Sequence, residues 1–165
     1  MLADARLVAG KDLRIERRAR VATNQVAPFA LLVLVLFAFA LDPDRGILDR
    51  ATAGLYWVAV LLSTVLAVQR AYALEAADGV PDALRLSGLD PAAVFLGKTA
   101  ALALQLLALE ALLLVGVAVL YTTELAGPVL LAATCLAAPV GLAAAGSLYG
   151  VLAAGLRVRE TLLPL

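Results

Sequence analysis

The sequence predicts an all-α, polytopic membrane protein, and three observations lead to that prediction. Hydrophobic residues make up 64% of the 165 residues, whereas charged residues make up 16%. The mean hydropathy of +0.98 is too high for a water-soluble globule of this size, which could not cover its apolar surface. The apolar residues also fall into four charge-poor runs, each long enough for a membrane span.

The four runs cover residues 21–41, 51–69, 99–123 and 128–156. A helix needs about 20 residues to cross the roughly 30 Å hydrocarbon core. None of the runs alternates as a strand would, and backbone groups in lipid must form hydrogen bonds within their own segment. We therefore expect four transmembrane helices in a single transmembrane domain covering residues 1–165. The fourth helix is expected to begin at Pro128 and to bend near Pro139, where a backbone donor is missing.

The first 20 residues predict an amphipathic N-terminal helix. They carry six basic side chains, Arg6, Lys11, Arg14, Arg17, Arg18 and Arg20. On a helix most of these share one arc, roughly opposite a thin apolar stripe of Ala5, Val8, Ile15 and Ala19. This pattern is typical of a helix that lies in the headgroup layer of a membrane. Because the run adjoins a membrane span and lacks interleaved aromatic residues, we expect no nucleic-acid binding.

Lys and Arg are distributed unevenly between the two sides that the spans define. Eleven lie before the first span, between the second and third, or after the fourth, whereas only Arg45 and Arg50 lie on the other side. Segments rich in Lys and Arg stay in the cytoplasm, so the N-terminus and residues 70–98 are predicted to be cytoplasmic.

Residues 70–98 form the only long polar interval between hydrophobic segments. Gly79 and Pro81 are expected to end the second membrane helix, and a short helix is expected over residues 82–86. A short helix joined at both ends to spans acts as a lever, because pushing it moves two membrane helices together. The alternative is an ordinary solvated connector.

The ends of this short helix also have sequence signals. Asp78 or Asp82 is expected to be its N-terminal acid, and Gly88 is expected to end it. Asp90 is well placed to cap a helix that begins at Pro91 and continues into the third span.

An energy-supplying partner would have to bind this connector. The candidate contact residues are Glu75, Asp78, Gly79, Asp82, Leu84, Arg85 and Leu86. Leu84 and Leu86 are apolar side chains that would fill a groove of the partner.

Glu110 is the one ionisable residue deep within a predicted span. A carboxylate at the bilayer centre costs about 2.5 to 3.5 kcal/mol, so Glu110 must face protein, pair, or be neutral. Two roles are open: a residue of a transport pathway, or a packing residue at a helix interface.

Gly146 and Gly150 form a G-x-x-x-G pattern, which favours close packing of helices. No catalytic constellation and no phosphate-binding loop is present in the sequence. The chain has no His and only Cys135, so we expect no metal site formed by this chain alone.

Several patterns follow one another along nearly the whole chain. The longest is ATAGLYWVAVLLSTVLAVQRAYALEAADGVPDALRLSG at residues 51–88. The others are DLRIERRAR with a following Asn and PF at 12–29, ALDPD at 40–44, Lys98 ahead of the third span, and APVGLAAAGSLYGVLAAGLRVR at 138–159. Together they resemble the CcmB family, the membrane subunit of the haem exporter of cytochrome c maturation, which is an ABC transporter permease.

The resemblance implies an ABC exporter permease fold in the bacterial inner membrane, acting in haem export or delivery. ATP would be hydrolysed by a separate subunit, so the chain itself is not expected to be an enzyme, and the seven connector residues would couple it to that ATPase. The implied partners are an ABC ATPase subunit (CcmA-like), a haem-handling membrane protein (CcmC-like), a small membrane subunit (CcmD-like) and a haem chaperone (CcmE-like). Two copies of the chain are expected in the complex.

Haem is expected as cargo of the complex rather than as a cofactor of this chain. Where the family often has a His shortly after the Lys of the third span, this chain has an apolar residue, so no haem ligand is assigned. Two other functions remain open: an ABC exporter permease for a drug, lipid or polysaccharide, and a non-transporting membrane assembly subunit. The family continues into further spans, and residues 161–165 are expected to begin a possible fifth span.

Overall fold

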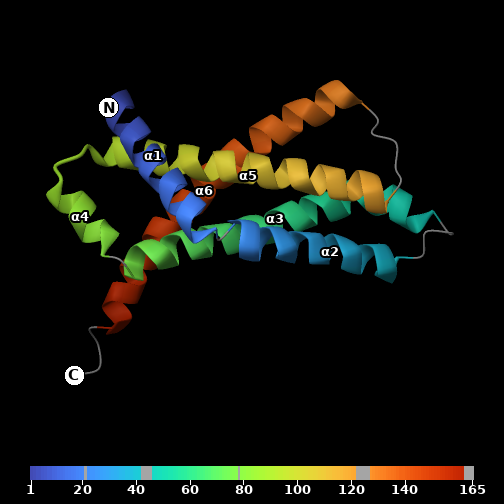
Figure 1. Ribbon diagram of the computed structural model, residues 1–165, viewed down its shortest axis with the longest axis horizontal. Coiled ribbons are helices and arrows are strands. Elements are labelled where there is room, and N and C mark those ends of the chain that lie inside the picture. The colour runs from blue at the N-terminus through green and yellow to red at the C-terminus, as the bar shows by residue number, and fades with distance from the viewer. Residues whose placement is uncertain (21, 42–45, 78, 122–126, 162–165) are drawn as a thin grey trace.

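The computed structural model describes residues 1–20, 22–41, 46–77, 79–121 and 127–161, and these are helical with no strand among them. The elements are α1 (Leu2–Ala19), the π-helical η1 (Ala22–Val26), α2 (Ala27–Ala40), α3 (Ile47–Ala77), α4 (Val80–Leu86), α5 (Pro91–Leu120) and α6 (Pro128–Thr161). Figure 1 shows α2, α3, α5 and α6 as an elongated bundle, with α1 and α4 at one end. The predicted all-α membrane architecture is confirmed.

Three of these helices are long and apolar enough to cross a membrane. The membrane-compatible stretches are Arg50–Ala73 in α3, Pro91–Leu120 in α5 and Val129–Leu152 in α6. The first predicted span is less regular, because α2 has only 14 residues and rises about 21 Å, short of the core. η1 precedes it directly, and the segment Asn24–Ala40 is bent by 53° from α1. The described residues therefore contain three candidate spans, or four if α1 and the segment Asn24–Ala40 together count as one bent span.

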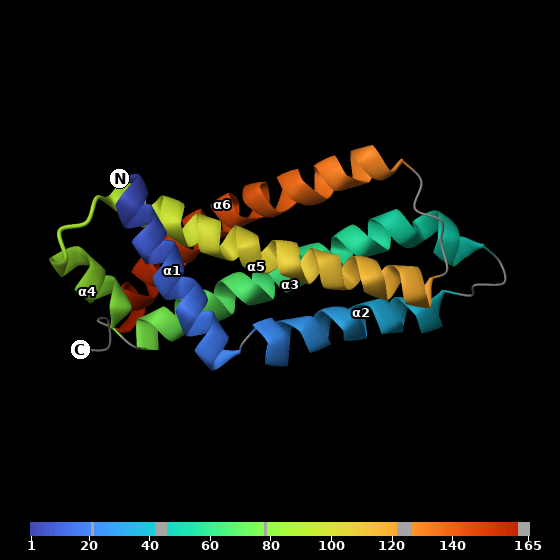
Figure 2. The same ribbon diagram turned by 45° about the horizontal axis from the view of Figure 1, so that its top comes forward.

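The helix α5 lies at the centre of the bundle and packs against α1, α2, α3 and α6. Figure 2 shows it running between α6 and α2. Its buried residues Leu106 and Leu113 share one apolar cluster with Leu34 of α2 and Val60 of α3. The hydroxyl of Tyr121, at the end of α5, donates a hydrogen bond of 2.9 Å to the backbone oxygen of Leu34. A lipid-embedded bundle gains stability from such close packing rather than from water exclusion alone.

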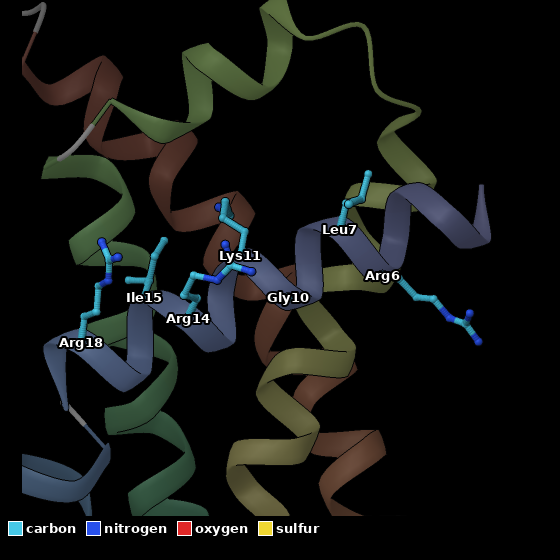
Figure 3. Close-up of a pocket in the computed structure, with 7 residues that line it drawn as sticks. All are labelled: Arg6, Leu7, Gly10, Lys11, Arg14, Ile15 and Arg18. Carbon is cyan, nitrogen blue, oxygen red and sulfur yellow. The ribbon is translucent and has the colours of Figure 1, made fainter.

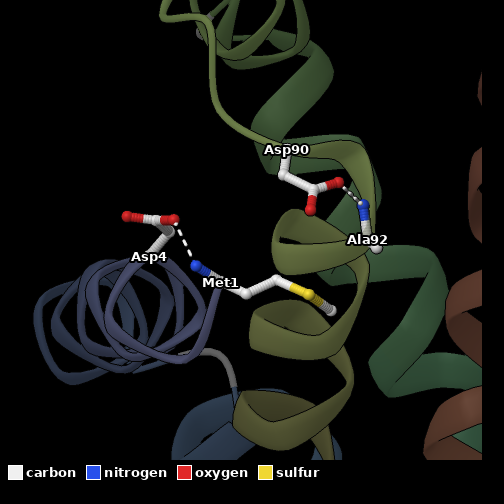
Figure 4. Close-up of polar contacts among 4 residues, drawn as sticks. All are labelled: Met1, Asp4, Asp90 and Ala92. Atoms are coloured by element: carbon white, nitrogen blue, oxygen red, sulfur yellow. Dashed lines mark hydrogen bonds and ion pairs between the residues drawn. The ribbon is translucent and has the colours of Figure 1, made fainter.

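The connector agrees with its prediction at the end of the second membrane helix and differs at the start of its short helix. The helix α3 ends at Ala77, shortly before Gly79 and Pro81, as predicted. The short helix α4 begins at Val80 rather than at Asp82. The N-cap of α4 is Gly79, with a φ of +65°, rather than either predicted aspartate. Only glycine adopts this left-handed backbone without strain. The cap of α5 is as predicted: a side-chain oxygen of Asp90 accepts a hydrogen bond of 2.9 Å from the backbone nitrogen of Ala92, as Figure 4 shows.

The last helix, α6, begins at Pro128 as expected and includes Pro139 within an uninterrupted helix. It extends to Thr161, the first of the residues that were expected to begin a further span. Residues 162–165 lie outside the described part of the chain.

Candidate functional site

Polar and charged side chains gather at the end of the bundle where α1 and α4 lie. This end also holds the last turns of α3 and α6 and the first turns of α5 (Figures 1 and 2). We call it the α1–α4 end. It is the end that the distribution of Lys and Arg predicts to be cytoplasmic.

At this end α1 crosses α5 so closely that the contact requires glycine. A Cβ atom added at Gly97 would lie 2.6 Å from the backbone oxygen of Ala5 and 2.7 Å from Cβ of Val8. Val8 is buried in this contact. Part of the apolar stripe of the N-terminal helix therefore packs on α5 of the same chain.

Lys98, next to this contact, links α1 to α5 by charge. Its Nζ lies 3.7 Å from Oδ2 of Asp12, and Oδ1 of Asp12 lies 2.8 Å from Nζ of Lys11. The side chains of Lys98 and Asp12 are only 11% and 16% exposed. An ion pair that is largely covered is screened less than a surface pair, and loss of one partner leaves the other charge poorly solvated.

Tyr72 extends this connection from α5 to α3 and α6. Nζ of Lys98 lies 5.6 Å from the centroid of the Tyr72 ring, within the range of a cation–π interaction. The Tyr72 hydroxyl donates a hydrogen bond of 2.9 Å to the backbone oxygen of Ser147. Asp12, Lys98, Tyr72 and Ser147 thus form a series of polar contacts across four helices, which we call the Asp12–Ser147 chain.

Gly146 and Gly150 lie on the face of α6 that packs against α3. A Cβ atom added at Gly146 would lie 2.6 Å from Cγ2 of Val68, and one added at Gly150 would collide with the ring of Tyr72. The two glycines and their two neighbours are each one helical turn apart, so the pairs meet in register. In this structure the G-x-x-x-G face is used within the chain.

The predicted coupling segment α4 stands out from the bundle and is held mainly by contacts with α3. The backbones of Gly79 and Gly88 at its two ends have φ values of +65° and +68°. Leu84 is half-buried, whereas the side chain of Leu86 is 88% exposed. The side chains of the other four candidate coupling residues, Glu75, Asp78, Asp82 and Arg85, lie outside the described residues.

Glu110 is far from these residues, about 18 Å along α5 from Lys98. It is 2% exposed, and neither carboxylate oxygen has a hydrogen-bond partner within the described part of the chain. In the same bundle, the Tyr56 hydroxyl contacts Sγ of Cys135 at 3.6 Å. The structure therefore places Glu110 among side chains of the bundle and does not bring it to the α1–α4 end.

Within the described residues, no group of three or more His, Cys, Asp or Glu side chains could hold a metal ion. At the α1–α4 end, α4 joins α3 to α5 along the chain, and the Asp12–Ser147 chain links α1, α5, α3 and α6.

Sequence reasoning missed most of the Asp12–Ser147 chain. Lys98 was noted only as part of a family pattern, while Asp12 stood among many basic residues and Tyr72 followed a span without any distinguishing spacing. The one available signal was that Lys98 is the sole cation between Gly88 and the third span. A lysine that is covered by other side chains needs an oppositely charged or polar partner.

A family model described as CcmB protein matches residues 4–165. The chain is 37% identical over 79 residues to heme exporter protein B of Paracoccus denitrificans. This aligned region covers 48% of this chain and 36% of the relative. It is 34% identical over 90 residues to heme exporter protein B of Escherichia coli strain K12, covering 54% and 41%.

Heme exporter protein B of Rhodobacter capsulatus is 33% identical over 89 residues, which again covers 54% of this chain and 41% of the relative. The aligned region therefore spans less than half the length of each of these relatives. No solved structure matches this chain. Since the family model covers nearly every residue, the chain belongs to the CcmB protein family.

Proposed function

We propose that this chain is the permease subunit of an ABC transporter complex that exports or delivers haem for cytochrome c maturation. The observation that carries the proposal is the family match over residues 4–165, together with the name heme exporter protein B borne by the relatives. ATP hydrolysis belongs to a separate subunit, so the chain itself is not an enzyme. It lies in the bacterial inner membrane with the α1–α4 end in the cytoplasm.

The geometry of α4 supports coupling to an ATPase. The helix connects two long membrane helices, α3 and α5, and is joined to each through a glycine with positive φ. Its exposed Leu86 offers an apolar side chain that has no cover within the described chain. A partner that binds α4 and moves it would shift α3 and α5 together, since the Asp90 cap joins the connector to the first turn of α5.

In this proposal the CcmA-like ATPase binds α4. The CcmC-like, CcmD-like and CcmE-like proteins handle haem beside or beyond the bundle, and two copies of this chain are present. Haem is the cargo of the complex, and no residue of this chain is assigned as its ligand.

The experiment is a pull-down of the tagged chain in mild detergent, combined with the yield of cytochrome c in a complementation assay. Leu86→Asp should lower both the amount of co-purified ATPase and the cytochrome yield, because a carboxylate cannot fill an apolar groove. Leu2→Asp is the matched control, since Leu2 is also a strongly exposed leucine at the α1–α4 end. Leu2→Asp should leave both readouts near those of the unmodified chain.

Two outcomes would contradict the proposal in different ways. If no ATP-binding subunit co-purifies with the unmodified chain, the chain is a membrane assembly subunit rather than a permease. If an ATPase co-purifies but cytochrome c yield does not depend on the chain, the cargo of the complex is not haem.

A further inference from the structure

Seven residues of α1 surround a shallow depression of about 380 Å³ on the exposed side of the helix, which we call the basic groove. Four of the seven residues that line it are basic, namely Arg6, Lys11, Arg14 and Arg18. The other three are Leu7, Gly10 and Ile15. In Figure 3 all seven come from α1, with Arg6 extending away from the others toward the start of the helix.

The groove has no acidic lining residue, although α1 contains acidic residues elsewhere. Asp4 pairs with the N-terminal amine at 2.9 Å, and Asp12 pairs with lysines. The third acidic residue, Glu16, also takes part in an interaction and does not line the groove. Arg6, Arg14 and Arg18 form no ion pair with any residue that the structure describes. Since the crossing at Gly97 fixes α1 on α5, these arginines are held on the exposed side, where an anion from outside the described residues can reach them.

The depth of the groove indicates where that anion lies. The part of α5 beyond Lys98, from Thr99 to Leu120, rises about 33 Å, which is enough to cross a hydrocarbon core of about 30 Å. With that part of the membrane-compatible stretch in the hydrocarbon, the crossing of α1 at Gly97 lies at its edge, level with lipid headgroups. Ion pairs formed at this depth are screened less than in bulk water.

We propose that the groove binds the headgroup of an anionic glycerophospholipid. Arginine guanidinium groups form paired, charge-assisted hydrogen bonds to phosphate oxygens. Nothing lies within 4 Å of a Cβ position at Gly10, so a phosphate can approach the helix there. Leu7 and Ile15 would contact the glycerol and the first methylenes of the acyl chains. A free phosphate would make no contact with these two apolar side chains. An acidic protein surface is disfavoured at the edge of the hydrocarbon, because burying charge there is costly.

The test uses the full chain, stripped of lipid in mild detergent and titrated with phosphatidylglycerol or phosphatidylcholine, with bound lipid counted by native mass spectrometry. The unmodified chain should prefer phosphatidylglycerol by about 25-fold or more, because each basic side chain near an anionic lipid adds roughly fivefold. The variant R14Q/R18Q, which changes two lining residues one helical turn apart, should lose about 25-fold in phosphatidylglycerol affinity. The single variant R14Q should lose about fivefold.

The matched control is R17Q/R20Q, which removes the same charge from exposed positions outside the groove. It should change the affinity by less than about threefold, and thermal unfolding should show all variants folded. Equal losses in the two double variants would overturn the proposal in favour of a diffuse basic surface. Displacement of bound lipid by a large excess of inorganic phosphate would overturn it in favour of a free-phosphate site, and equal binding of the two lipids would reject an anionic ligand altogether.

Discussion

The Nζ atom of Lys98 lies 3.7 Å from Oδ2 of Asp12, directly beside the close contact of α1 with Gly97. A charge pair and a glycine contact therefore fix the N-terminal helix at the same point of α5. Because α5 packs against α2, α3 and α6, α1 is attached to the helix that contacts every other long helix of the bundle. Any displacement of α1 from the bundle must break a largely covered ion pair.

Asp12→Asn and Lys98→Gln should each destabilise the chain by about 1 to 2 kcal/mol, because each removes one side of a largely covered ion pair. The double variant should lose less unfolding free energy than the sum of the two single variants, with a coupling energy of about 1 kcal/mol. Thermal or denaturant unfolding in detergent measures all four proteins of this cycle. The control cycle pairs Asp12→Asn with Arg17→Gln on the exposed side of α1. In this cycle the two losses of unfolding free energy should be additive. Additive losses for Asp12 and Lys98 would show that the pair contributes nothing.

Gly97→Ala should destabilise the chain by about 1 to 3 kcal/mol, because its Cβ would press on the backbone oxygen of Ala5, which cannot rotate away. The control is Gly141→Ala in α6, where nothing lies within 4 Å of the added atom. Alanine is the better helix former, so Gly141→Ala should be neutral or stabilising by up to about 1 kcal/mol. Equal unfolding temperatures for the two variants would mean that α1 does not cross α5 this closely.

The sequence was a good guide where one segment decides the structure. The apolar runs located the membrane helices, and the Asp90 cap was correct because a cap depends on neighbours within one turn. The start of α4 was less predictable. The helix α3 ends at Ala77, shortly before Gly79 as predicted, but α4 begins at Val80 rather than Asp82, with Gly79 as its N-cap.

Contacts between segments were beyond the reach of the sequence. Gly97 has no feature that distinguishes it from Gly141, and only the crossing of α1 makes one of them indispensable. Tyr72 and Ser147 are distant in sequence, and their hydrogen bond depends on how α3 and α6 pack. Leu86 was predicted as a contact residue because an apolar side chain in the connector would fill a groove of a partner, and that prediction needs no knowledge of how the helices pack.

Labelling of single cysteines tests the orientation of the bundle. In a chain whose own cysteine is replaced by Cys135→Ala, Ser87→Cys lies at the α1–α4 end and Ile47→Cys lies at the start of α3, at the opposite end of the bundle. Both native side chains are exposed. A maleimide that cannot cross membranes should label Ile47→Cys in intact spheroplasts and Ser87→Cys only after permeabilisation, because the Lys- and Arg-rich side stays in the cytoplasm. The reverse pattern would put α4 out of reach of a cytoplasmic ATPase.

Glu110 is expected to act by packing rather than as a residue of a transport pathway. It is buried against other side chains, with no hydrogen bond to either carboxylate oxygen from the described residues. Glu110→Gln keeps the shape of the side chain, so stability should stay within about 1 kcal/mol of the unmodified chain and cytochrome c yield should be retained. Glu110→Ala leaves a cavity and should cost about 2 kcal/mol or more in unfolding free energy.

The pair of variants separates the two roles because they change different properties. A packing role depends on volume, so Glu110→Ala should be less stable and give less cytochrome c than Glu110→Gln. A pathway role depends on the ionisable group, so both variants would lose cytochrome c yield equally even where Glu110→Gln is normally expressed and folded. That second result would reject the packing role and would place the route of transport along α5, about 18 Å from the Asp12–Ser147 chain.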